Sequence, residues 1–279
     1  MLSVFAKNDP NLKLHRFAHF GEVSSCDDMR TSPEKPPLSA VGTVRAKFNL
    51  VSSVPVDSSG QPAKHGGARN RSDRTSDHLT IKQVENIIGA AGFANEIGLA
   101  LNRMLTIHWQ QAGLVVDDIV KATGRFCDLL AKALGRHRHE TAIIWVQENG
   151  FRKCGGPKGG HIHLLAHIPA AMVKRIDRLK FGWLRSITGQ SYTKGVILSR
   201  PVGGKLGIEI TNELLHFENL SVAVGYLVKG ASQMAAAQFG LSRLEAGGVC
   251  IGKRCSVSQN IGEAARVASK PTSPHIGEE

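Results

Sequence analysis

Aromatic residues are scarce in this chain of 279 residues, because phenylalanine, tryptophan and tyrosine together make up only 5% of it. Few side chains can therefore provide the flat platforms on which single-stranded bases stack. We expect Trp109 and Trp183 to belong to the hydrophobic core instead. The two tyrosines are Tyr192 and Tyr226, so a reaction that uses a phenol must use one of them.

Cysteines are also few. Their number, five, is odd, and no two of them have Cys-x-x-Cys spacing. This pattern argues against a disulfide framework and against a zinc ribbon. We interpret all five residues as reduced thiols: Cys26, Cys127, Cys154, Cys250 and Cys255.

Long apolar runs are absent, and no stretch approaches the roughly 18 residues that a membrane-spanning helix needs. Lys7 and Asp9 interrupt the opening of the chain, and no apolar region typical of a secretory signal follows them. The motif Gly-x-x-x-x-Gly-Lys-Ser/Thr is missing too, which excludes an ATPase loop of that type. We expect a cytoplasmic protein with no membrane partner and no helicase motor of its own.

Acidic residues are in the minority, with 23 Asp and Glu against 35 Lys and Arg, so the formal net charge is +12. A positive chain attracts polyanions by long-range steering and counterion release, and nucleic acid is the first candidate. The ordinary alternative is that the charge only keeps the protein soluble. The candidate DNA-binding cations lie in a basic helix, a glycine-rich loop and a late basic pair: Arg175, Arg178, Arg185, Lys158, Lys253 and Arg254.

Composition divides the chain into three parts. Residues 1–78 are rich in Ser, Pro, Gly and charge, which predicts a disordered basic arm, and residues 259–279 are interpreted as a polar tail. Between them, residues 79–258 have the apolar periodicity of a folded domain, whose first helix we expect Ser76-Asp77 to cap. The predicted helices are 80–92, 114–134, 170–187 and, more ambiguously, 219–230, and the predicted strands are 101–109, 142–148, 160–169 and 194–201. This mixed order predicts an α+β fold with a central antiparallel sheet.

Two histidines, His161 and His163, flank Ile162 in an apolar strand. Because side chains alternate along a strand, both imidazoles point to one face while Ile162 enters the core on the other. Just upstream, the predicted strand 142–148 ends in Glu148, and the glycine-rich connection 149–159 is typical of a hairpin loop. Two imidazoles and a carboxylate can hold a metal ion. The alternative is a pair of hydrogen-bonded structural histidines.

Other histidines in the chain provide a contrast. His137 and His139 flank Arg138 in a basic run, where neighbouring cations would repel a metal ion, so we interpret this pair as part of a solvated turn. His167 precedes Pro169 closely. We expect it to cap the end of the strand and not to be the third metal ligand.

Three short motifs occur in order along the chain: Met104-Leu105-Thr106-Ile107, His161-Ile162-His163 and Tyr226-Leu227-Val228-Lys229. In this order the chain, over residues 101–230, resembles the HUH endonucleases of the rolling-circle replication initiator (Rep) type, which occur in bacterial mobile elements and phages. In the relaxase branch of that superfamily the tyrosine lies near the N-terminus. Here it follows the histidines, so the resemblance is to the Rep or transposase branch.

The resemblance implies both a fold and a chemistry. The fold is α+β, with an RRM-like central antiparallel sheet flanked by helices. The chemistry is the nicking and joining of single-stranded or hairpin DNA at an origin, where Tyr226 would attack the phosphodiester and form a 5′-phosphotyrosine bond with the assistance of Lys229. Mn²⁺ or Mg²⁺ would be held by His161, His163 and Glu148. A separate host helicase would open the duplex.

Two other functions compete with this interpretation. A non-catalytic DNA-binding regulator could use the same fold and charge without a metal or a nucleophile, and a transposase-type HUH nuclease would use the same chemistry in another process. The histidine-triad nucleotide hydrolases need a third alternating histidine, and that position is Leu165. Tyr192, in a polar stretch that reads as a turn, is the competing nucleophile.

Overall fold

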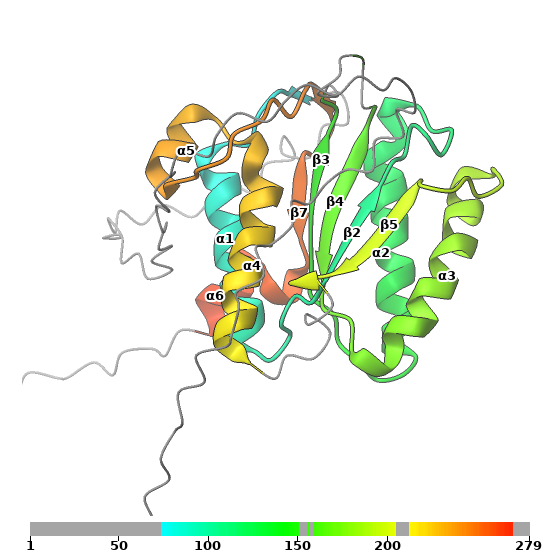
Figure 1. The fold of residues 1–279 in the computed structure, drawn as a ribbon, viewed down its shortest axis with the longest axis horizontal. Coiled ribbons are helices and arrows are strands. Elements are labelled where there is room, and N and C mark those ends of the chain that lie inside the picture. The colour runs from blue at the N-terminus through cyan, green and yellow to red at the C-terminus, as the bar shows by residue number, and fades with distance from the viewer. Residues whose placement is uncertain (1–73, 151–155, 157–158, 205–211, 270–279) are drawn as a thin grey trace, which may run out of the picture. The chain divides into compact units, whose positions relative to one another are not determined.

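The computed structural model describes residues 74–150, 156, 159–204 and 212–269 (Figure 1). A five-stranded antiparallel sheet with helices on both faces confirms the predicted α+β fold. Most of the predicted arm, the end of the predicted tail and Lys158 lie outside the described residues. The strand order across the sheet is β5 (Ile197–Pro201), β2 (Arg103–Ile107), β4 (His161–Ala166), β3 (Ile143–Glu148) and β7 (Cys255–Val257).

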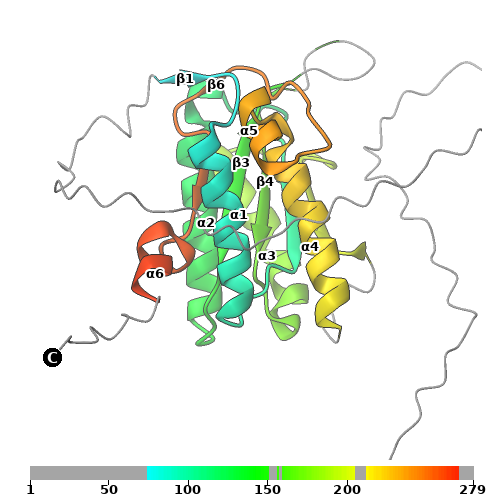
Figure 2. The same cartoon turned by 90° about the vertical axis from the view of Figure 1, so that its left-hand side faces the viewer.

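Two pairs of helices cover the two faces of the sheet (Figures 1 and 2). Alternation along the strands divides the core, because Ile144 and Leu165 pack towards one pair while Trp145 and Leu164 pack towards the other. The first pair is α1 (Ile81–Glu96) and α4 (Glu213–Leu227), and the second is α2 (Ile119–Gly135) and α3 (Ala170–Thr188). Shorter helical elements are η2 (Val116–Asp118), η4 (Val228–Gly230) and α5 (Gln233–Phe239).

Helix α1 is capped by Thr80 and not by the predicted Ser76-Asp77 pair. The Thr80 hydroxyl accepts a hydrogen bond from the backbone N–H of Gln83, and the Gln83 side chain accepts one from the backbone N–H of Thr80. This reciprocal arrangement satisfies two donors at the helix start. Ser76 instead belongs to β1 (Thr75–Ser76), which pairs with β6 (Cys250–Ile251). The last residues of the predicted arm therefore include a strand of the domain.

The segment predicted as a polar tail starts with regular structure. After β7, the chain forms η5 (Gln259–Ile261) and α6 (Glu263–Ala268). Ile261 is fully buried in the same core as α1, and the Arg266 guanidinium donates a 2.8 Å hydrogen bond to the side-chain oxygen of Asn86 on α1. The prediction of a tail from residue 259 is therefore corrected, because these two side chains dock residues 259–268 on the domain.

The structure also bears on the predictions for Trp109, for the cysteines and for membrane-spanning helices. Trp109 is fully buried and its indole N–H donates to the Thr123 hydroxyl over 2.9 Å, as a core tryptophan requires. Among the described cysteines, Cys127, Cys250 and Cys255 are free thiols. None of the helices in the described part of the chain is long and apolar enough to cross a membrane.

Candidate metal centre

The hairpin of β3 and β4 brings Glu148 together with His161 and His163. In the antiparallel register Glu148 pairs with His161, and Val146 pairs with His163. Val146 belongs to the core under α1 and α4. Because alternate residues of a strand share a face, and paired residues lie on the same face, Glu148, His161 and His163 project from that side of the sheet too. The predicted hairpin is confirmed, and it places three potential ligands at one end of the sheet.

The three side chains form one buried cluster. Nε2 of His161 lies 3.5 Å from Oε2 of Glu148, and Nε2 of His163 lies 3.4 Å from the same oxygen. Each of the three residues offers one potential ligand atom, and these three atoms lie within 4.8 Å of one another. The side chains are between 1% and 5% exposed. This cluster could hold a metal ion.

Hydrogen bonds on the outer side of each ring orient the two imidazoles. Nδ1 of His161 donates to the carbonyl oxygen of Gly159 over 2.8 Å, and Nδ1 of His163 lies 3.0 Å from the Thr106 hydroxyl. In both rings Nε2 is buried and has no hydrogen-bond partner among the described residues. Metal-binding histidines commonly have such an outer partner, because it fixes the ring and leaves the other nitrogen for the metal.

The spacing of the cluster also fits a single cation. Two ligands that each lie about 2.1 Å from a cation are about 3.0 Å apart at a right angle and about 3.4 Å apart at the tetrahedral angle. The separations of 3.4 Å and 3.5 Å between imidazole nitrogen and carboxylate oxygen match the wider value. They exceed the roughly 2.7–3.2 Å of an ordinary N–H···O bond. The spacing of the residues present therefore fits a single cation.

Opposing influences set the charge state of the cluster. Burial by itself raises the pKa of Glu148, but His163, His161 and Lys229 together hold this pKa well below 4.5. Lys229 acts from η4, where its Nζ contacts both carboxylate oxygens. Burial, reinforced by Lys229, lowers the pKa of His163 to about 3. Near neutral pH the cluster therefore combines a neutral imidazole with an ionised carboxylate, the state that binds cations.

Tyr226 lies at the C-terminal end of α4, beside this cluster. Its ring makes an edge-to-face contact with the ring of His163, with centroids 4.8 Å apart and planes at 74°. Two cations lie near the same phenol ring, since Nζ of Lys229 is 4.2 Å and Cζ of Arg243 is 5.0 Å from its centroid. Helix α4 runs towards the cluster, which is why a residue 63 positions after His163 in the chain becomes its neighbour.

The other candidates for catalysis or metal binding lie apart from the cluster. Tyr192 packs edge-to-face on Phe181 of α3, with ring centroids 4.6 Å apart. His167 holds the strand end as predicted, with Nδ1 2.8 Å from the carbonyl oxygen of Ala100. His137 lies in an exposed turn after α2, as predicted for that basic run. Of the two tyrosines, Tyr226 is therefore the one that contacts a candidate ligand.

Sequence reasoning missed the roles of two residues of the β2 region. Thr106 pairs with His163 across the sheet and contacts its ring nitrogen. His108, just beyond the strand, stacks on His161 with centroids 5.1 Å apart and planes at 27°. The alternation of side chains along a strand could have predicted both contacts, because residues 106 and 108 of an extended segment face the same side.

The predicted DNA-binding cations of α3 lie on the other face of the sheet from the cluster. Arg175, Arg178 and Arg185 are exposed on α3, which covers the opposite face of the sheet from α4 (Figure 1). Lys253 is exposed between β6 and β7. Their accessibility suits contact with a polyanion.

Arg254 requires a correction. The prediction placed it on a DNA-binding surface, whereas its side chain is buried, with 2% exposure. Its guanidinium donates to the carbonyl oxygens of Ser76 and Gly248 over 2.6–3.1 Å. Arg254 therefore joins β1 to the segment before β6, and this buried charge is compensated by backbone acceptors.

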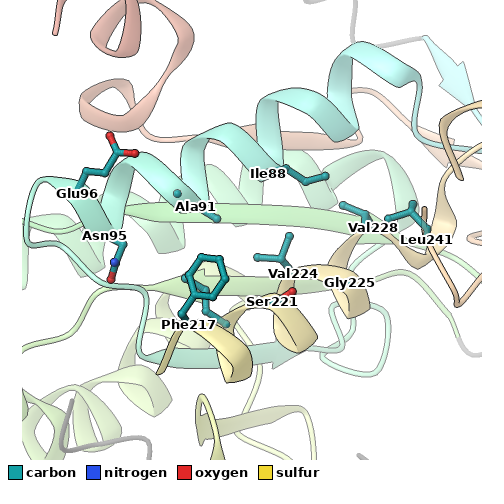
Figure 3. Close-up of a pocket in the computed structure, with 12 residues that line it drawn as sticks. Ile88, Ala91, Asn95, Glu96, Phe217, Ser221, Val224, Gly225, Val228 and Leu241 are labelled. Carbon is teal, nitrogen blue, oxygen red and sulfur yellow. The ribbon is translucent and has the colours of Figure 1, made fainter. Parts of the chain in front are cut away.

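A separate cavity opens between α1 and α4 (Figure 3). Among the described residues that line it, Glu96 is the one titratable side chain, and most of the lining is apolar. Such a lining offers no set of groups for metal or phosphate chemistry. The lining residues are Ile88, Ala91, Gly92, Asn95, Glu96, Phe217, Leu220, Ser221, Val224, Gly225, Val228 and Leu241.

Comparison with protein-family models, with curated proteins and with solved structures gives no match for this chain. Its chemistry must therefore be argued from the cluster itself. Two imidazoles and a carboxylate can hold a cation, and a phenol stands against one of the imidazoles. Such an arrangement can neutralise an anionic substrate and present a nucleophile to it.

Proposed function

We propose that this protein nicks and rejoins single-stranded DNA through a covalent 5′-phosphotyrosine intermediate, with the help of a divalent metal ion. The observation that carries the proposal is the contact of Tyr226 with His163, a member of the buried metal-ligand cluster. A phenol, a cation site and further positive side chains supply the nucleophile and the charge compensation that phosphodiester transfer needs. The order of motifs, which resembles that of Rep-type HUH endonucleases, supports the same proposal.

The metal ion would be held by Glu148, His161 and His163. Carboxylate oxygen suits Mg²⁺ and Mn²⁺, whereas imidazole nitrogen suits softer ions better than Mg²⁺. The mixed set of ligands therefore favours Mn²⁺ over Mg²⁺. When bound, the ion would supply Lewis-acid charge to the scissile phosphate.

Tyr226 acts as the nucleophile in this proposal. Its phenol oxygen forms a bond to phosphorus, the bond from phosphorus to the 3′ oxygen breaks, the phenol gives up its proton and the released 3′ oxygen takes one up. One phosphodiester replaces another, so the bond energy is conserved for rejoining. Lys229 lies close to the phenol ring, with Nζ 4.2 Å from its centroid, and would assist the attack from there.

Single-stranded or hairpin DNA is the expected substrate. The net charge of +12 favours a polyanion, and a strand without a partner can bend to bring one phosphate to Tyr226. Because the chain lacks an ATPase loop of the Gly-Lys-Ser/Thr type, a separate host helicase would open the duplex. The process that fits best is initiation of rolling-circle replication of a mobile element or phage in the cytoplasm.

A test of the proposal is covalent capture of DNA. Wild type, Tyr226→Phe, His163→Ala and the matched control Tyr192→Phe are incubated with Mn²⁺ and labelled single-stranded oligonucleotides of random sequence. We expect an adduct that survives boiling in detergent in wild type and in Tyr192→Phe only, and we expect chelation of the metal to abolish it. Salt-sensitive DNA binding without any adduct would instead favour a non-catalytic DNA-binding regulator.

A further inference from the structure

The segment between α5 and β6 (residues 240–249) lies against the end of the site, as the orange coil in Figure 2 illustrates. Backbone contacts fix it there. The N–H of Glu245 donates to the carbonyl oxygen of Lys229 over 2.8 Å, and the N–H of Asn149 donates to that of Gly247 over 2.7 Å. Gly248 has φ 67° and lies so close to Asn149 that a Cβ atom would be 1.8 Å from the carbonyl oxygen. The segment therefore presents its side chains from a defined position.

Arg243 is the residue of this segment whose side chain reaches Tyr226, with Cζ 5.0 Å from the ring centroid. Its Nε and Nη2 both donate to one carboxylate oxygen of Glu245. A guanidinium has five N–H donors, so three of them have no partner among the described residues. The side chain is 48% exposed. Arg243 is thus oriented by Glu245 and still open to an anion from solution.

Lys229 is placed differently, although it lies near the same ring. Its side chain is 1% exposed, and its ammonium contacts both oxygens of Glu148. To bind a phosphate it would have to leave a buried carboxylate without a partner, which is costly. A guanidinium also matches two phosphate oxygens at once, which an ammonium cannot do. Of the two cations at Tyr226, Arg243 is therefore the better phosphate ligand.

We propose that Arg243 is a catalytic residue whose guanidinium binds the phosphate that Tyr226 attacks, and that Glu245 is the positioning residue that orients it. This inference rests on the proposed nicking reaction and gives Lys229 and Arg243 separate roles in it. Lys229 compensates the charge of Glu148, while Arg243 neutralises the negative charge that grows on the phosphate oxygens in the transition state.

The test measures the single-turnover rate of adduct formation at saturating oligonucleotide for Arg243→Gln, Arg243→Lys and the matched control Arg136→Gln, whose side chain is exposed after α2. We expect Arg243→Gln to be about 100- to 1,000-fold slower, Arg243→Lys to recover part of the rate and the control to equal wild type. Ethylguanidinium in solution should accelerate Arg243→Ala. If Arg243→Gln reacts as fast as wild type, the assignment is wrong.

Two further readouts separate the possible failures. In a Tyr226→Phe background, loss of Arg243 should reduce the salt dependence of oligonucleotide binding by about 0.7 in slope, the value for one phosphate contact on a single strand. An unchanged slope would show that Arg243 does not contact the phosphate, whether or not wild type forms an adduct. Absence of an adduct in wild type would instead refute the nicking proposal itself. Glu245→Gln should slow wild type but not Arg243→Gln, because a positioning residue acts only through its partner.

Discussion

Replacement of Lys229 by methionine tests the charge balance of the candidate metal centre. Lys229 is the cation whose ammonium contacts Glu148, and both side chains are almost fully buried. Methionine preserves most of the volume but leaves the carboxylate beside two imidazoles of which His163 is neutral near pH 7. We therefore expect Lys229→Met to destabilise the metal-free protein and to make its stability depend on added Mn²⁺.

The expected magnitude follows from burial. Removal of one partner of a buried ion pair costs roughly 3–5 kcal/mol, because the remaining charge is left without compensation. For a folded part of this size each kcal/mol corresponds to about 2–4 °C in Tm, so metal-free Lys229→Met should melt roughly 10 °C below wild type. Mn²⁺ at about 100 times its Kd should restore about 2.7 kcal/mol. Wild type should gain less from the same Mn²⁺, because Lys229 already compensates the carboxylate.

Thermal and urea unfolding with and without Mn²⁺ measure both effects. The control is Glu148→Gln combined with Lys229→Met, which removes both charges and should neither lose as much stability nor respond to Mn²⁺. The reasoning is refuted if metal-free Lys229→Met melts with wild type, or if Mn²⁺ stabilises the double variant as much as the single one.

Two other outcomes follow from the same contacts. Thr106→Val should weaken Mn²⁺ binding about 10- to 100-fold in calorimetric titration, because it removes the outer partner of His163. The control Thr123→Val removes the hydrogen bond from Trp109 on the other face of the sheet, and it should lower Tm without changing Mn²⁺ binding. The free energy of unfolding of the metal-free protein, measured in urea, should fall as the pH falls from 6.5 towards 3. The pKa values of His163 and Glu148 lie below their ordinary values in the folded protein, so the unfolded chain binds more protons over this range. A free energy of unfolding that does not change with pH would contradict these lowered pKa values.

The candidate metal ligands could be predicted from the sequence because their proximity depends on short-range rules. Alternation placed His161 and His163 on one face, and a glycine-rich connection after Glu148 predicted a hairpin. In the hairpin Glu148 pairs with His161, so this carboxylate lies beside the two histidines, as the sequence predicted.

The remaining features depend on contacts between distant segments. The burial of Arg254 results from the pairing of β1 with β6, two strands of two residues each that carry no visible sequence pattern. The ion pair of Lys229 with Glu148 depends on how the end of α4 and η4 pack on the sheet. The approach of Arg243 to Tyr226 depends on how the chain folds back after α5. Periodicity does not encode such contacts, which arise only when the helices pack on the sheet.

Peptide mapping of the protein after reaction with single-stranded DNA and Mn²⁺ tests the central claim most directly. Nuclease digestion would leave a short nucleotide remnant on the residue that attacked, and mass spectrometry would locate it. We expect a remnant joined through a 5′ phosphate to Tyr226, and none when Glu148, His161 or His163 is replaced. A remnant on Tyr192 or on a serine, or one that forms equally well without the three ligands, would contradict it.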